Sequence, residues 1–185
     1  EISSILGRMR ELAVESASEV LQATERAYLE TEFDALQAEA ERIAQSTEFN
    51  GLNLTDGTDT SVAVQVGIFN VTAEDRISVS LAAIDTGTLA VDSGTISVST
   101  VAGAQSSITA IDTAIDSLNS TRAQYGADQN RLTSAVRSLE NYTENLVEAE
   151  SRIRDVDFAS ATASMTRNQI FQQAGLSVLS QANSS

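Results

Sequence analysis

The chain has 185 residues, and its 26 acidic side chains outnumber 11 basic ones, which gives a net charge of −15. Because it contains no His and no Cys and all its basic residues are Arg, it lacks a thiolate or Ser-His-Asp nucleophile, a Schiff-base Lys and the usual Cys/His zinc site. Its acidity disfavours nucleic acid and anionic membranes as partners, and we therefore expect no enzyme, no cofactor and no metal site.

Residues 1–48 are predicted to form two helices, because turn-forming residues are rare and apolar residues recur at spacings of three and four. The apolar stripe of the first helix is Ile2, Leu6, Met9, Ala13, Ala17 and Val20. The stripe of the second helix is Leu29, Phe33, Leu36, Ala40 and Ile43. The second helix is expected to begin near residue 28, after a join within residues 22–28.

Residues 49–104 alternate between apolar and polar side chains, which is typical of half-buried strands. The apolar positions of three predicted strands are Val62, Val64 and Val66, then Ile77, Val79 and Leu81, then Ile96 and Val98. The pairs Asn50-Gly51, Asp56-Gly57 and Ser93-Gly94 predict turns. Strands this short are not stable alone, so we expect them to lean on the helices.

Residues 105–157 are predicted to form one long helix with a seven-residue repeat. The repeating seam is Ile111, Leu118, Tyr125, Leu132, Leu139, Leu146 and Ile153. A heptad repeat of this length is typical of a coiled coil. We expect the seam to pack against the opening helices of residues 1–45.

Residues 158–185 are rich in Ser, Ala and Gln, and they carry apolar positions with few charges. A helix of this kind is marginal without packing partners, so we expect it to be one half of a helix pair. Together the four segments predict a mainly α fold. It is an elongated antiparallel helical bundle or coiled coil with a small β-hairpin region at one end.

Five stretches, in the same order, closely resemble bacterial flagellin. They are LGRMRELA at 6–13, EFNG at 48–51, YGADQNR at 125–131, SRIRDVDFA at 151–159 and IFQQAGLSVL at 170–179. The resemblance implies a secreted structural subunit that polymerises with other flagellin subunits into the extracellular flagellar filament for motility. It also implies a flagellar export chaperone that binds the C-terminal region.

The resemblance further implies that this chain is a trimmed flagellin, without the variable outer domains and without part of the terminal helical domain. We therefore expect it to stay monomeric at micromolar concentration. The alternative is a hook-filament junction protein of the flagellin-like type, which has related helical ends.

Recognition by Toll-like receptor 5 is a second implication, because the family's contact motif matches Arg8, Leu12 and Glu39. At 100° per residue, Ile5, Arg8 and Leu12 are expected to flank the core stripe of the first helix, and Glu39 flanks the second stripe in the same way. Alternatively, Leu12 and Ile5 pack on the second helix and Arg8 makes only a surface ion pair, which stabilises little. Gly7 stands where stimulatory family members often carry Gln, which predicts weaker recognition.

Overall fold

A computed structural model describes residues 1–154 and 158–184. Residues 155–157 and 185, which end the third and fourth predicted segments, lie outside the described residues. The helices are α1 (Ile2–Ser16), α2 (Ala23–Ser46), α3 (Thr72–Asp75), α4 (Val101–Arg154) and α5 (Phe158–Ser184). The strands are β1 (Glu48–Phe49), β2 (Leu52–Asn53), β3 (Ser61–Gln65) and β4 (Arg76–Ser80). The predicted mainly α fold is confirmed, and the chain divides into two units, residues 1–136 and 137–185, which are described separately.

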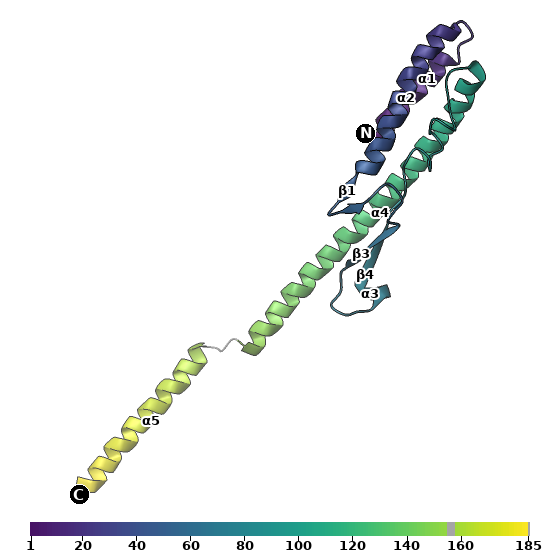
Figure 1. The fold of residues 1–185 in the computed structure, drawn as a ribbon. Helices are drawn as coiled ribbons and strands as arrows, with labels where there is room; N and C mark the ends of the chain where they lie inside the picture. Colours follow the sequence, from purple (N-terminus) through teal and green to yellow (C-terminus); the bar gives the residue numbers. More distant parts are fainter. Residues whose placement is uncertain (155–157, 185) are drawn as a thin grey trace. The chain divides into compact units, whose positions relative to one another are not determined.

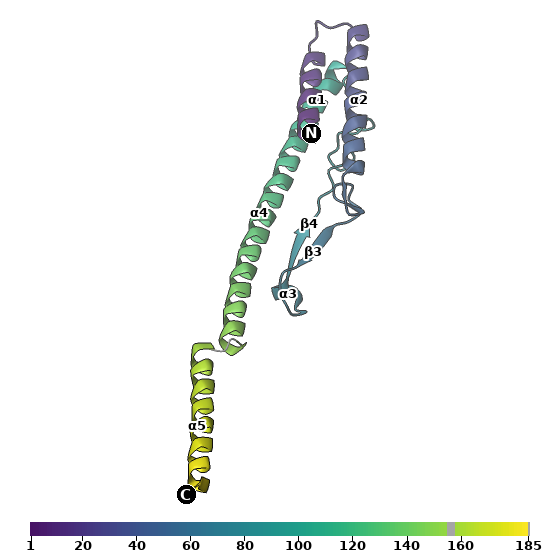
Figure 2. The same ribbon diagram turned by 90° about the vertical axis from the view of Figure 1, so that its left-hand side faces the viewer.

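The first two helices form an antiparallel hairpin (Figure 2). The prediction that α2 begins near residue 28 is wrong by five residues. The Glu25 carboxylate accepts a hydrogen bond from the Gln22 backbone N–H at 2.8 Å, and this half of a capping box starts the helix at Ala23. Val20 belongs to the predicted stripe of the first helix, but α1 ends at Ser16 and leaves Val20 in the connection, 87% exposed.

Arg26 holds the connection between α1 and α2 in place. Its guanidinium donates hydrogen bonds to the backbone carbonyls of Ser16, Ser18 and Leu21, at 3.0, 2.7 and 2.7 Å. The side chain is only 8% exposed. Because the last carbonyls of a helix have no partner within the helix, this one side chain caps α1 and fixes the turn that follows it.

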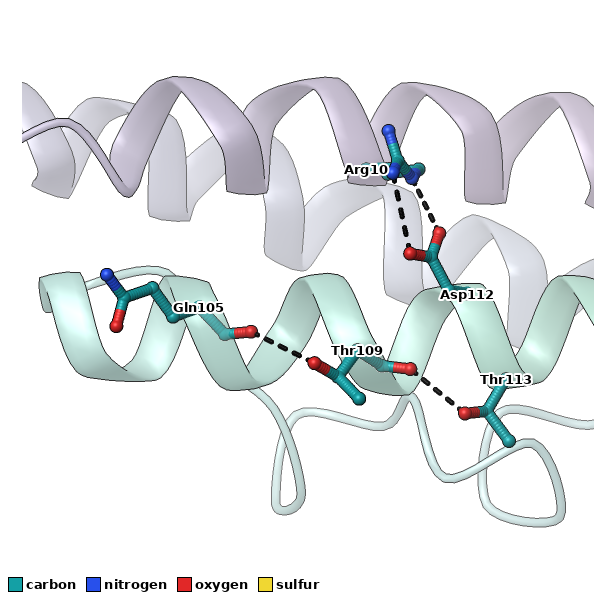
Figure 3. Close-up of polar contacts among 5 residues, drawn as sticks. All are labelled: Arg10, Gln105, Thr109, Asp112 and Thr113. Carbon is teal, nitrogen blue, oxygen red and sulfur yellow. Dashed lines mark hydrogen bonds and ion pairs between the residues drawn. The ribbon is translucent and has the colours of Figure 1, made fainter.

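The hydrophobic core lies where α1, α2 and the first part of α4 come together, and α1 runs antiparallel to both α2 and α4 (Figures 1 and 2). Its largest fully buried apolar side chains are Phe33, Leu6, Met9, Leu12, Ile111, Val91 and Val98. At the surface, Arg10 of α1 forms an ion pair with Asp112 of α4, with Nε and Oδ1 2.6 Å apart (Figure 3). Figure 3 also shows the Thr109 and Thr113 hydroxyls donating to carbonyls one turn earlier on the exposed side of α4.

Residues 82–100 form an irregular segment, so the predicted third strand at Ile96 and Val98 is wrong. The two side chains are nevertheless buried, as the alternation implied. No strand is paired with this segment among the described residues. Instead, the Glu30 carboxylate of α2 accepts the Val98 N–H at 2.5 Å, and the Glu41 carboxylate accepts the Thr86 N–H at 2.9 Å. Carboxylates of α2 therefore accept backbone N–H groups that the carbonyls of a neighbouring strand would accept in a sheet.

Two short hairpins precede this segment. The β1–β2 turn is Asn50-Gly51, with φ of 52° and 78°, as two-residue hairpin turns require. The β3–β4 hairpin pairs Val62 with Val79 and Val64 with Ile77. Both predicted strands are therefore confirmed, although each ends one residue before its last predicted position, Val66 or Leu81. The Tyr125 hydroxyl of α4 accepts the Ala82 N–H at 3.0 Å and ties the base of this hairpin to the helix.

Candidate assembly and recognition surfaces

The heptad seam of α4 passes from buried to exposed along its length. Ile111 and Leu118 lie in the core, with exposed fractions of 0% and 5%. Tyr125 and Leu132 are half-buried beside the β3–β4 hairpin. Leu139, Leu146 and Ile153 are 37%, 50% and 88% exposed. Packing against the opening helices therefore accounts for the first part of the seam, and the last three positions carry the repeat onward with increasing exposure.

The second unit, residues 137–185, has many large apolar side chains in contact with solvent. We call the following twelve the C-terminal apolar residues: Leu139, Tyr142, Leu146, Val147, Ile153, Phe158, Met165, Ile170, Phe171, Leu176, Val178 and Leu179. Within α5 the only charged side chain is Arg167. Exposed apolar surface on this scale marks an interaction site. None of the described helices is sufficiently long and apolar to cross a bilayer.

The residues expected to flank the α1 stripe lie in two different environments. Leu12 is only 1% exposed, so its placement outside the core is wrong. The reason is that α1 is covered on two sides, by α2 and by α4, and its buried arc is wider than one stripe. Ile5 is half-buried against the same core, as the alternative interpretation expected.

Arg8 and Glu39 lie at the surface, and each is held by an ion pair. Arg8 contacts Glu32 of α2 at 2.8 Å and Glu11 at 3.0 Å. The hydrogen bonds to Glu32 and then to Glu11 raise the pKa of Arg8. Glu39 contacts Arg42 at 2.6 Å, and the hydrogen bond from Arg42 lowers the pKa of Glu39. Both charges are therefore fixed at neutral pH, in defined positions on the α1–α2 hairpin.

Comparisons with known proteins match both helical parts of the chain. The profile described as the bacterial flagellin N-terminal helical region matches residues 1–60, and that of the C-terminal helical region matches residues 108–185. The flagellin of Halalkalibacterium halodurans is 42% identical over 183 residues, which is 99% of this chain and 66% of the relative. A flagellar filament 30.7 kDa core protein of Treponema maltophilum is 34% identical over 193 residues, 99% of this chain and 68% of the relative. The chain belongs to the bacterial flagellin family.

A solved structure supports the same assignment at the level of the fold. The crystal structure of Bacillus cereus flagellin superposes with a TM-score of 0.63 at 32% identity, covering 80% of this chain and 83% of that one. As a flagellin, the chain is a structural subunit of the extracellular flagellar filament and not an enzyme. It spans about two thirds of the curated relatives named above, and only residues 61–107 separate its two matched regions.

The sequence reasoning missed the polar residues that shape this flagellin. Glu30, Gln37 and Glu41 all bond the irregular segment, and the Gln37 amide donates to the Val91 carbonyl at 2.9 Å. Gln37 and Glu41 follow Glu30 by seven and eleven residues, which places the three side chains on one face of α2. This spacing is the feature of the sequence that could have indicated their shared role. Arg26 stands among solvent-facing neighbours, and nothing in the local pattern marks it as a buried cap.

Proposed function

We propose that this flagellin polymerises through contacts that join unlike surfaces of successive copies and bury the C-terminal apolar residues. Contacts of this kind do not close on themselves and therefore generate open helical assemblies. Full burial of a large apolar side chain contributes about 1.5–3 kcal/mol. Covering twelve half-exposed ones would contribute roughly 10–20 kcal/mol, against an association cost of about 4–15 kcal/mol. Most of this surface must be covered for the polymer to be stable.

The assembly proposal is tested by sedimentation and electron microscopy over a concentration series, with and without sheared filaments as seeds. We expect the wild-type chain to stay monomeric at micromolar concentration without seeds and to grow when seeds are present. We expect Leu146→Glu, which places a charge on the seam, to lose this seeded growth. Asn145→Glu is the matched control, because it adds the same charge at the neighbouring exposed position. Absence of pelletable filaments with seeds, or equal growth of the two variants, would contradict the proposal.

We also infer that a flagellar export chaperone binds α5 before assembly. The support is the same exposed apolar surface, because a chaperone that covers it prevents premature association. Isothermal titration with the chaperone should show weaker binding for Phe171→Ser than for Gln172→Ser, a neutral change at the next position. Equal affinities would argue against α5 as the binding segment.

Toll-like receptor 5 recognition is a second candidate function, and the exposed, doubly paired guanidinium of Arg8 favours it. A charged group already held in place loses less conformational entropy on binding. Leu12 is excluded from this surface because it is buried, so the proposal rests on Arg8 and Glu39. In a reporter-cell assay we expect Arg8→Ala to lose signal and Arg10→Ala, from the same helix, to keep it. We expect Gly7→Gln to gain signal. If Arg8→Ala signals like the wild-type chain, recognition does not use this surface.

A further inference from the structure

The tip of the β3–β4 hairpin, residues 66–75, presents the large apolar side chains of Ile68, Phe69 and Val71 to solvent. Ile68 and Phe69 are each 67% exposed. Together with the backbone that carries them we call this feature the tip knob. Isolated exposed apolar residues are ordinary, but two adjacent ones on a constrained loop are a candidate contact.

The backbone of the tip knob is fixed by two polar side chains. The Asp75 carboxylate accepts the Val71 N–H at 3.0 Å, and the Asp75 carbonyl accepts the Gly67 N–H at 3.0 Å. The Gln65 amide donates to the carbonyls of Gly67 and Phe69, at 2.9 and 2.8 Å. A Cβ at Gly67 would lie 1.7 Å from Asp75 Oδ1, so only Gly permits this close approach. A preformed loop costs less to order on binding.

An apolar groove of about 450 Å³ lies between the base of the same hairpin and α4. Its apolar lining is Leu54, Val79, Leu81, Tyr125 and Leu132. Asp128, on the α4 side, is ion-paired with Arg131 at 3.0 Å. This volume lies within the range of pockets that take small ligands, and it has room for one or two large side chains.

The tip knob and the groove of one chain are separated by the hairpin itself. Five residue pairs join the tip to the base, which corresponds to about 17 Å at about 3.3 Å per residue. Both views show the tip, marked by α3, at the end of the hairpin away from α2 (Figures 1 and 2). A rigid hairpin of this length prevents a chain from filling its own groove.

We propose that Ile68 and Phe69 of one copy of this flagellin insert into the groove of a second copy. The inference rests on the proposed polymerisation and names one of its contacts. The tip knob and the groove are unlike surfaces of the same chain. When two copies join, one copy keeps an unfilled groove and the other keeps a free tip knob, so further copies can add at both ends, head to tail.

The size of the contact determines how it can be detected. Two inserted side chains and their lining bury a few hundred Å², well below the roughly 1,200 Å² of a stable interface. The charge of −15 on each copy opposes association further. We therefore expect a dissociation constant of about 1 mM for this contact alone, which adds to the burial of the C-terminal apolar residues in the polymer.

The test is methyl NMR of the full chain at increasing protein concentration, up to about 1 mM. We expect the groove methyl signals of Val79, Leu81 and Leu132 to shift with concentration in the wild-type chain. Phe69→Ser should abolish the shifts. Phe49→Ser is the matched control, because Phe49 is 72% exposed on a different hairpin, and it should keep them.

A mixing experiment then identifies the occupant of the groove. Unlabelled wild-type protein added to labelled Phe69→Ser should restore the groove shifts, because the added copies supply knobs, whereas unlabelled Phe69→Ser should not. Groove signals that stay still in the wild-type chain, or move equally in Phe69→Ser, overturn the inference. Filaments that form without any groove shift overturn it and leave polymerisation standing. Groove shifts without filaments support the insertion of the tip knob and refute only the proposed polymerisation.

Discussion

Replacing Arg26 with Ala should destabilise the first unit more than any other single Arg change at the α1–α2 hairpin. Its guanidinium bonds the Ser16 carbonyl at the end of α1 and two carbonyls of the connection that follows. Leaving the buried Ser16 carbonyl unpaired costs about 1–3 kcal/mol, and each of the other two bonds, whose carbonyls water can reach, contributes about 0.5–1 kcal/mol. The expected loss is about 3 kcal/mol, a large part of the roughly 5–15 kcal/mol by which a domain is stable.

Urea unfolding followed by far-ultraviolet circular dichroism measures this loss. With a denaturant slope of about 2 kcal/mol per molar, the midpoint of Arg26→Ala should fall by about 1.5 M. Arg26→Lys should lie between the two proteins, because Lys keeps the charge but lacks the planar fork that reaches three carbonyls.

Arg42→Ala is the matched control, since Arg42 lies on the same helix and makes only an exposed ion pair with Glu39. Its midpoint should stay at the wild-type value. A fall of equal size in Arg42→Ala would show that the loss is not specific to the cap. An unchanged midpoint in Arg26→Ala would refute the cap and show that water replaces the three bonds without loss.

Three further predictions concern pH and backbone fit. The Thr95 hydroxyl and then the Gly94 N–H lower the pKa of Asp92, so Asp92→Asn should lower the urea midpoint at pH 7. The difference should disappear as the pH falls from the unfolded pKa of about 3.9 through the folded value. Burial, and then the charge of Glu30, raise the pKa of Asp34. Asp34→Asn should therefore raise the midpoint at pH 7, and the gain should fade as the pH falls through the folded pKa towards the same unfolded value. An added Cβ at Gly126 meets no described atom within 4 Å, whereas at Gly67 it meets Asp75. By thermal unfolding, Gly126→Ala should stabilise by about 0.5–1 kcal/mol, while Gly67→Ala should broaden the NMR signals of the hairpin tip. A loss of stability in Gly126→Ala, or unchanged NMR signals of the hairpin tip in Gly67→Ala, would contradict the geometry.

Features with a local period could be predicted from the sequence. The stripes through Met9 and Phe33 and the seam from Ile111 follow the helical repeat, and the β3–β4 strands follow the two-residue alternation. Each pattern depends only on neighbours along the chain. The flagellin motifs likewise appear as short local stretches, and they indicated the family before any contact was known.

Only the tertiary structure decided what covers each pattern. Leu12 is buried because α1 packs into a core that α2, α4 and the irregular segment also supply, and no pattern within α1 records these contacts. Val98 alternates like a strand residue, but a strand requires a neighbour to pair with, and here the Glu30 carboxylate takes its N–H. The apolar seam continues to Ile153, yet its exposure depends on what lies beside it. Periodicity fixes which side chains share a face. Burial depends on segments distant in the chain, and for that reason burial could not be predicted from periodicity.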